Sequence, residues 1–280
     1  MKISEIIAAI ETVAPLRLQE SYDNSGLQTG HPDQETTGAV LCVDATEEIL
    51  LEAERKGCNL VISHHPLLFH GVKCVAGRNR PERVLEMAIR MGITIYSSHT
   101  AMDSSPAGIS RRMAAMLGLR DVEVLVPQSP GSNEGLGAVG NLSQAVPTDE
   151  FLQTIKSTFG CKMLRMSAGF RPDAIGRVAL CGGSAGEFVP EAIAAGAQVY
   201  ITADCKHNHF LDHSHRILLV DAGHFETEEC SKQIFLDILT EKFPNFPLKR
   251  ICQHHSGIAS KKAKSATFSD IRHSDQIRGG

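Results

Sequence analysis

The stretch NLVISHH, residues 59–65, has the pattern of a short buried strand that ends in two histidines. Working outward from it, a strand-like run lies at residues 39–43, and the helix predicted between the two ends at Gly57. A further helix begins at Pro81, and a strand at residues 93–98 follows it. Strand and helix therefore alternate, which is typical of βα units on a largely parallel sheet.

A second α/β set follows a turn-rich break at residues 127–135, PQSPGSNEG. Helices are predicted from Thr148, over residues 188–195 and over residues 227–243. Strands are predicted at residues 162–166, 177–181, 197–204 and 216–221. The sequence thus predicts an α/β fold with two sets of strands flanked by helices. The closing segment, residues 253–280, carries almost no apolar periodicity, and we expect it to be a solvated, disordered tail.

The composition is that of an ordinary globular chain of 280 residues, with 42% hydrophobic and 21% charged residues. The formal net charge of −4 argues against a nucleic-acid partner, because non-specific binding needs a basic field. No apolar run approaches the roughly 18–20 residues of a membrane helix. The opening MKISEIIAAIETVAP lacks the uninterrupted apolar core of a signal peptide. We therefore expect a soluble, cytoplasmic protein.

The eight cysteines include no CxxC pair. Structural zinc sites usually show such paired spacing, so a zinc finger is not expected. Several cysteines, such as Cys42 and Cys181, lie inside apolar runs, where a reduced cysteine behaves as a small core hydrophobe.

Side chains that commonly bind metals follow four of the predicted strands. Ligands of open α/β sheets bind beyond the carboxyl ends of the strands, so these residues are expected at one edge. A single histidine at a strand end is usually a hydrogen-bonded loop residue, and an aspartate such as Asp103 can be a helix N-cap. The four groups taken together nevertheless favour a metal site. They are His64 and His65; His99 and Asp103; Asp204, His207 and His209; and Asp221, His224 and Glu228.

The number of candidate ligands indicates more than one ion. Five side chains are too many for one catalytic zinc with an open position, whereas a bridging carboxylate can serve a pair of ions. Glu228 is the candidate bridge, since it lies one helical turn from His224. We expect His65 and Asp103 on one ion, and His64 and His224 on the other. Nitrogen and oxygen donors without thiolate favour zinc, manganese or iron, and His99 remains for proton transfer.

Several motifs, in order along residues 1–250, resemble the Ngg1-interacting-factor-3-like family, whose members are often labelled GTP cyclohydrolase 1 type 2 homologues. They are SYDNSGLQTG, VISHHPLLFHG, SSHTAMDSSPAG, CGGSAG with VYITADCKH, and DAGHFETE. The resemblance implies two metal ions held by five residues. Carried over one by one, the family's ligands match His64, His65, Asp103, His224 and Glu228.

The resemblance also implies a two-domain protein in which the second α/β domain is inserted into the first. We expect residues 1–126 and 216–252 to form the metal-binding domain and residues 127–215 the inserted one. It further implies a ring-shaped homohexamer whose metal sites face an internal cavity. This chain departs from the family at Tyr22, where members often have Trp, and at Ala203, where members commonly have Gly.

The glycine-rich turn CGGSAG, Cys181 to Gly186, has two interpretations. Its backbone amides can cradle an anion, but it lacks the lysine and the spacing of a phosphate-binding loop. A tight strand-to-helix turn explains it equally well.

Three functions fit these residues. The first is a metal-dependent hydrolase that acts on a nucleotide or another small polar substrate, with GTP ring opening suggested by the family label. The second is a non-catalytic protein for metal handling or regulation that stores or delivers ions. The third is a scaffold or partner-binding protein that uses metal only for stability. Composition does not separate them.

Overall fold

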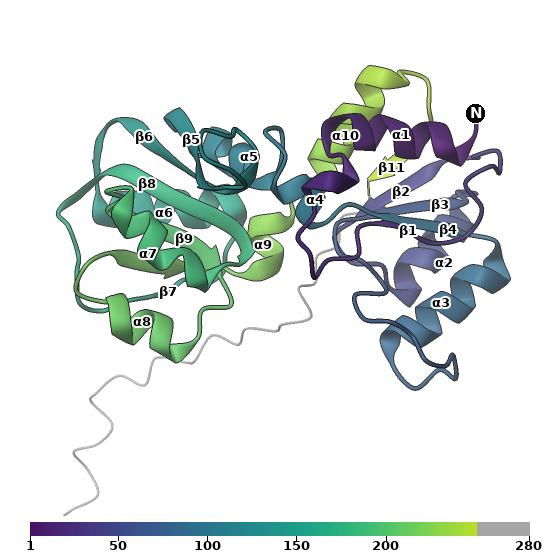
Figure 1. Ribbon diagram of the computed structural model, residues 1–280, viewed down its shortest axis with the longest axis horizontal. Coiled ribbons are helices and arrows are strands. Elements are labelled where there is room, and N and C mark those ends of the chain that lie inside the picture. The colour runs from purple at the N-terminus through teal and green to yellow at the C-terminus, as the bar shows by residue number, and fades with distance from the viewer. Residues whose placement is uncertain (251–280) are drawn as a thin grey trace, which may run out of the picture.

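Two β-sheets, each covered by helices on both faces, lie side by side in the computed structural model, which describes residues 1–250 (Figure 1). The predicted tail at 253–280 lies outside the described residues. The helices are α1 (Ile3–Val13), α2 (Glu47–Arg55), α3 (Arg80–Met91), α4 (Thr100–Asp103), α5 (Ile109–Met116), α6 (Thr148–Phe159), α7 (Val189–Ala194), α8 (His207–His213), α9 (His224–Glu228) and α10 (Ser231–Lys242). The strands are β1 (Gly26–Thr29), β2 (Ala39–Cys42), β3 (Leu60–Ser63), β4 (Thr94–Ser97), β5 (Arg120–Pro127), β6 (Gly135–Pro147), β7 (Arg165–Met166), β8 (Ala174–Ser184), β9 (Val199–Ala203), β10 (Leu218–Asp221) and β11 (Leu248–Arg250).

The first sheet has the strand order β1-β4-β3-β2-β11 and is parallel except for β1. Its inner strands are buried on both faces, which is why they read as continuous apolar runs rather than as an alternating pattern. Successive side chains point to opposite faces. Val40 and Cys42 therefore pack with α2 and α3, whereas Ala39 and Leu41 pack with α1 and α10.

The second sheet has the order β5-β6-β8-β9-β10-β7 and is mixed. Its centre, β8-β9-β10, is parallel, and the outer strands pair antiparallel. Helices α5 and α6 cover one face and α7 covers the other. After β10 the chain runs through α9 to α10, which packs beside α1 on the first sheet. Helices α4 and α9 consequently lie between the two sheets (Figure 1).

The α/β fold class is confirmed, and the strands predicted at residues 39–43, 59–65 and 93–98 are β2, β3 and β4. The change of sheet, however, does not coincide with the predicted limits. The turn-rich stretch 127–135 joins β5 to β6, which pair with each other inside the second sheet. Residues 216–221, expected with the first domain, contain β10, which pairs with β9. As limits of folding units, residues 127 and 215 stay a prediction.

Two expectations from composition can be compared with the described part of the chain. Within residues 1–250 no helix combines the length and the apolar character needed to cross a membrane. Most cysteines of this part are buried among apolar side chains, as expected, and Cys74 is exposed.

Candidate metal centre

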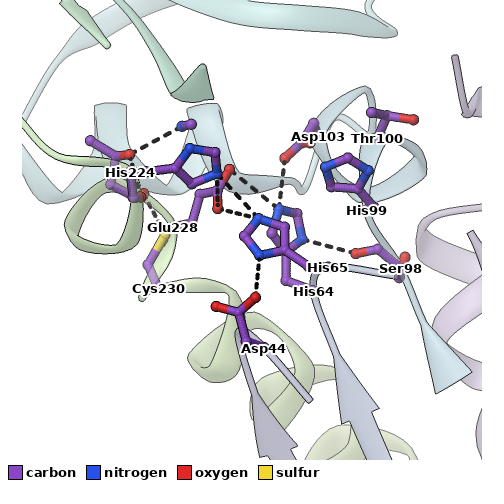
Figure 2. Close-up of polar contacts among 12 residues, drawn as sticks. Asp44, His64, His65, Ser98, His99, Thr100, Asp103, His224, Glu228 and Cys230 are labelled. Carbon is purple, nitrogen blue, oxygen red and sulfur yellow. Dashed lines mark hydrogen bonds and ion pairs between the residues drawn. The ribbon is translucent and has the colours of Figure 1, made fainter. Parts of the chain in front are cut away.

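Three strand ends and two short helices bring the predicted ligands together (Figure 2). His64 and His65 follow β3, and Asp103 ends the short helix α4 that follows β4. His224 and Glu228 begin and end α9, one helical turn apart, directly after β10. The first sheet therefore supplies three of these side chains and the segment after the second sheet supplies two. We call these five residues the central cluster.

Glu228 lies at the middle of the central cluster and is nearly fully buried. Its Oε2 atom is 2.8 Å from Nε2 of His65 and 3.1 Å from Nε2 of His224. Its Oε1 atom is 3.6 Å from Nε2 of His64, which in turn is 3.8 Å from Oδ1 of Asp103. The two carboxylate oxygens thus face two different sets of donors.

The structure groups these ligands differently from the expected division between two ions, and that division stays a prediction. His65 lies with His224, since their Nε2 atoms are 3.2 Å apart, whereas His64 lies with Asp103. Adjacent residues at a strand end point to opposite sides, so His64 and His65 do face different partners, as the sequence indicated. Which partner each histidine meets depends on how α9 is placed against the first sheet.

Each histidine around the site is held through its other ring nitrogen. Carbonyl and carboxylate oxygens only accept hydrogen bonds, so Nδ1 carries a proton and donates, and Nε2 is the ring nitrogen that faces the cluster. Such second contacts fix ring orientation and tautomer at metal sites. The acceptors are the Ser98 carbonyl for His64 at 3.0 Å, Asp44 for His65 at 3.1 Å, Asp204 for His224 at 2.7 Å and Asp23 for His99 at 2.8 Å.

The residues present fit a divalent metal ion. Nε2 of His64 is buried and has no hydrogen-bond partner within the described residues. A buried polar group without a partner costs about 1–3 kcal/mol, and a cation beside Nε2 of His64, Oε1 of Glu228 and Oδ1 of Asp103 would satisfy it. His65, His224 and Glu228 also offer one ligand atom each within 4.8 Å of one another, as do His64, His65 and His99.

Electrostatics within the cluster couple its charges. Burial lowers the pKa of His65, but the Asp44 and Glu228 carboxylates outweigh it and raise that pKa to about 10. Burial likewise opposes protonation of His224, yet Glu228 and Asp204 raise its pKa to about 9. Burial favours the neutral form of Glu228, but the surrounding histidines hold its pKa well below the usual range. The metal-free cluster is therefore an ion-pair network whose histidine protons must leave when a cation binds.

The glycine-rich end of β8 packs directly against the cluster. Gly183 has φ +66°, and a Cβ at this position would lie 2.1 Å from Oε1 of Glu228 and 3.4 Å from Nε2 of His224. Only glycine accepts both the left-handed backbone and this close approach. Residues 181–184 of the stretch Cys181 to Gly186 therefore belong to β8 rather than to a turn, and Gly183 makes room for the central carboxylate.

A cavity of about 410 Å³ opens between the two sheets over the central cluster. One wall comes from the first sheet and contains His65, His99 and Asp103. The opposite wall is the segment from Cys181 to Phe188 together with α9. Pockets between two structural units are a common position for small-molecule sites.

Not every candidate ligand belongs to this site. His207 and His209 lie on α8, and His209 accepts a hydrogen bond from the Lys206 backbone at 3.2 Å. Asp221 pairs with Arg165 at 3.0 Å instead. From the third strand end only Asp204 contributes, as the hydrogen-bond acceptor of His224 in a left-handed conformation with φ +51°.

Two acceptors were not predicted from the sequence. Asp44 stands just beyond β2, in the same strand-end position as the other ligands, so the pattern AVLCVDA carried a usable signal. Asp23 lies in the turn before β1, inside the motif SYDNSGLQTG, to which the sequence assigned no contact with a histidine. Its carboxylate holds His99 and also accepts from the Thr100 hydroxyl at 2.6 Å and the Ser25 hydroxyl at 2.7 Å.

Comparison with known proteins supplies a family context for this arrangement. A family model described as Duf34/NIF3 (NGG1p interacting factor 3) matches residues 1–256. A Lactococcus lactis protein named GTP cyclohydrolase 1 type 2 homolog is 32% identical over 251 residues, covering 89% of this chain and 93% of the relative. A Clostridium perfringens protein of the same name is 34% identical over 230 residues, covering 81% and 87%.

Solved structures share the fold. Staphylococcus aureus protein SA1388 has a TM-score of 0.85 and 25% identity, covering 93% of this chain and 99% of that one. Reduced HcgD from Methanocaldococcus jannaschii has a TM-score of 0.76 and 26% identity, covering 89% and 97%. These similarities extend over both sheets.

Proposed function

Because the chain belongs to the Duf34/NIF3 family, we propose that it is a divalent-metal-dependent hydrolase with a dinuclear site that acts on a nucleotide or another small polar substrate. The observation that carries this proposal is the position of Glu228, whose two oxygens face two separate sets of donors. Its Oε2 atom with His65 and His224 would hold one ion, and its Oε1 atom with His64 and Asp103 would hold the other.

The donor set supports zinc, iron or manganese, since it combines imidazole with carboxylate and contains no thiolate. Bound ions of this kind lower the pKa of water and orient it for attack on a substrate. The protein contributes orientation, because every histidine around the site is fixed through Nδ1 before any ion binds. The cavity between the sheets gives a small substrate access to the cluster.

His99 is the candidate for proton transfer. Its ring lies 5.2 Å from that of His64 and 5.5 Å from that of His65, measured between centroids. Asp23 holds Nδ1 of His99 and accepts four further hydrogen bonds, so the ring is fixed with Nε2 left for the cavity. A positioned imidazole of this kind can act as a general acid or a general base.

The relatives' name makes GTP the first substrate to test. We extend the proposal to a cytoplasmic, ring-shaped homohexamer on the strength of the family resemblance. The competing function is metal storage or delivery without turnover, which the same ligands would serve.

Elemental analysis of protein purified without a metal-affinity tag tests the site first. We expect near two transition-metal ions per chain, and one or fewer in Glu228→Gln, because a glutamine side chain keeps a single oxygen and does not bridge. The exposed Glu191→Gln on α7 is the matched control and should keep both ions. Two ions in Glu228→Gln would refute the bridging assignment.

Turnover is tested separately, by following GTP and other nucleotides with the metal-loaded protein. Hydrolysis that is lost in Glu228→Gln and kept in Glu191→Gln supports the hydrolase. Two ions per chain with no hydrolysis of any nucleotide would favour metal handling instead.

A further inference from the structure

The cavity has an aromatic wall that the metal chemistry does not use. Tyr22 is 61% exposed and Phe69 is 39% exposed, although both are large and partly apolar side chains. Their ring centroids are 6.4 Å apart with the planes tilted by 52°, and both residues line the cavity. Phe69 also meets the edge of His99, with 6.0 Å between centroids. This pair places open aromatic surface beside the candidate proton-transfer group.

A single arginine lies in the same cavity. Of the cavity-lining residues within the described chain, Arg80 is the only arginine or lysine. Its Nη1 atom is 3.4 Å from Oδ1 of Asp44, and its side chain is about half exposed. A guanidinium carries five N–H donors in a planar fork, so this one long contact leaves donors for another oxyanion.

The contacts between neighbours order these groups along the cavity. Arg80 touches Asp44, which holds His65. On another side of His65 stands His99 (Figure 2), and Phe69 and Tyr22 follow it. The contacts therefore run from Arg80 through Asp44, His65 and His99 to the two aromatic rings.

We propose that Tyr22 and Phe69 form a stacking wall for the heteroaromatic ring of a nucleotide, and that Arg80 binds one of its phosphate groups. The proposal rests on the proposed function, because it names the substrate orientation for the same site. A ring on the aromatic wall and a phosphate on Arg80 would span the central cluster, which leaves the connecting part of the ligand over the ions. A cavity of about 410 Å³ falls within the range of roughly 300–1,000 Å³ of small-molecule sites.

Binding calorimetry with metal-loaded protein tests the two contacts separately, using guanosine 5′-monophosphate, guanosine and benzoate as probes. Base stacking on an aromatic side chain is strong enough that Tyr22→Leu should weaken both guanosine compounds by about tenfold. Tyr22→Phe keeps a stacking ring and should bind as the parent does. Arg80→Gln should weaken the monophosphate about tenfold and leave guanosine unchanged. Arg83→Gln, an exposed arginine paired with Glu47 one turn further along α3, is the control and should change neither.

The tyrosine content provides a second readout. The chain has three tyrosines and no tryptophan, and Tyr96 and Tyr200 are fully buried. A ring stacked on Tyr22 should therefore quench tyrosine fluorescence in the parent protein, and this quenching should disappear in Tyr22→Phe although binding persists.

The proposal is overturned if Tyr22→Leu binds the monophosphate as tightly as the parent, or if Arg80→Gln weakens guanosine and the monophosphate equally. Benzoate binding as tight as the monophosphate would overturn the nucleotide assignment. Nucleotide binding with these dependences but no turnover would refute the hydrolase and keep the subsite. Turnover that is unchanged by Tyr22→Leu and Arg80→Gln would support the hydrolase and refute the subsite.

Discussion

Substituting Gly183 by alanine should disturb one half of the metal centre more than the other. The added Cβ would lie 2.1 Å from Oε1 of Glu228. Contacts of a Cβ below 3.0 Å are essentially never seen. Either the Glu228 carboxylate or the backbone at Gly183 must therefore move by about 0.9 Å. A misplacement of about 1 Å at a catalytic group can reduce a rate by roughly 100-fold. We expect Gly183→Ala to lose the ion on the Oε1 side, with His64 and Asp103, before the ion on the Oε2 side.

The backbone strain of this substitution can be separated from the clash. Alanine in a left-handed conformation costs about 1–2 kcal/mol. Gly57 has the same φ of +66°, and a Cβ there would meet nothing within 4 Å. Gly57→Ala therefore incurs the backbone cost alone and is the matched control.

The assay combines metal counting, thermal unfolding of both metal-free variants, and nucleotide turnover. Gly57→Ala should lose stability but keep near two ions and the parent's rate. Gly183→Ala should show a similar or larger loss of stability together with about one ion per chain and a rate lower by roughly 100-fold. If Gly183→Ala keeps two tightly bound ions and the parent's rate, the close approach of Gly183 does not position Glu228.

Two further predictions concern the charges and the outer contacts. The pKa values of His65 and His224 are raised in the folded state, to about 10 and about 9, above the ordinary value of about 6.5. Their protonation therefore stabilises the metal-free protein fully below about pH 6.5, and this stability is lost as the pH rises through 9–10. Urea unfolding of metal-free protein between pH 6 and 10 should show this decline, and a rise would contradict the charge network. Asp44→Ala should weaken metal binding by about 10- to 100-fold because His65 loses the acceptor of Nδ1, whereas the exposed Asp212→Ala should bind as the parent does; equal affinities would show that Asp44 does not orient His65.

The parts of the fold that were predictable are those in which burial is complete. The inner strands of the first sheet are apolar at every position, and helices with clear caps separate them, as at Thr46 and Asn79. Strands β5 and β6 were not predicted from the sequence, because they are partly exposed and antiparallel. Their joining loop has the composition of a domain break although it closes a hairpin. Local sequence does not state which sheet a strand joins, so the pairing of β10 with β9 did not follow from it.

The site was more predictable than the sheets because its ligands stand at strand ends. His64, His65, His224 and Glu228 carry that signal in local sequence. The pairing of ligands did not follow from it, because α9 meets the first sheet only after the chain has built the second one. Asp44 occupies a strand end as well, but a lone carboxylate without a neighbouring histidine gives no local sign of its partner.

The central cluster takes three ligands from the first sheet and two from the segment that follows the second. An ion bound by ligands from both groups would link the first sheet to the segment that follows the second. Thermodynamic linkage then makes the relation reciprocal: whatever aligns the two sheets tightens metal binding, and metal binding favours that alignment. Substitutions where the two sheets meet, distant from any ligand, would in this way change metal retention without altering the coordinating atoms.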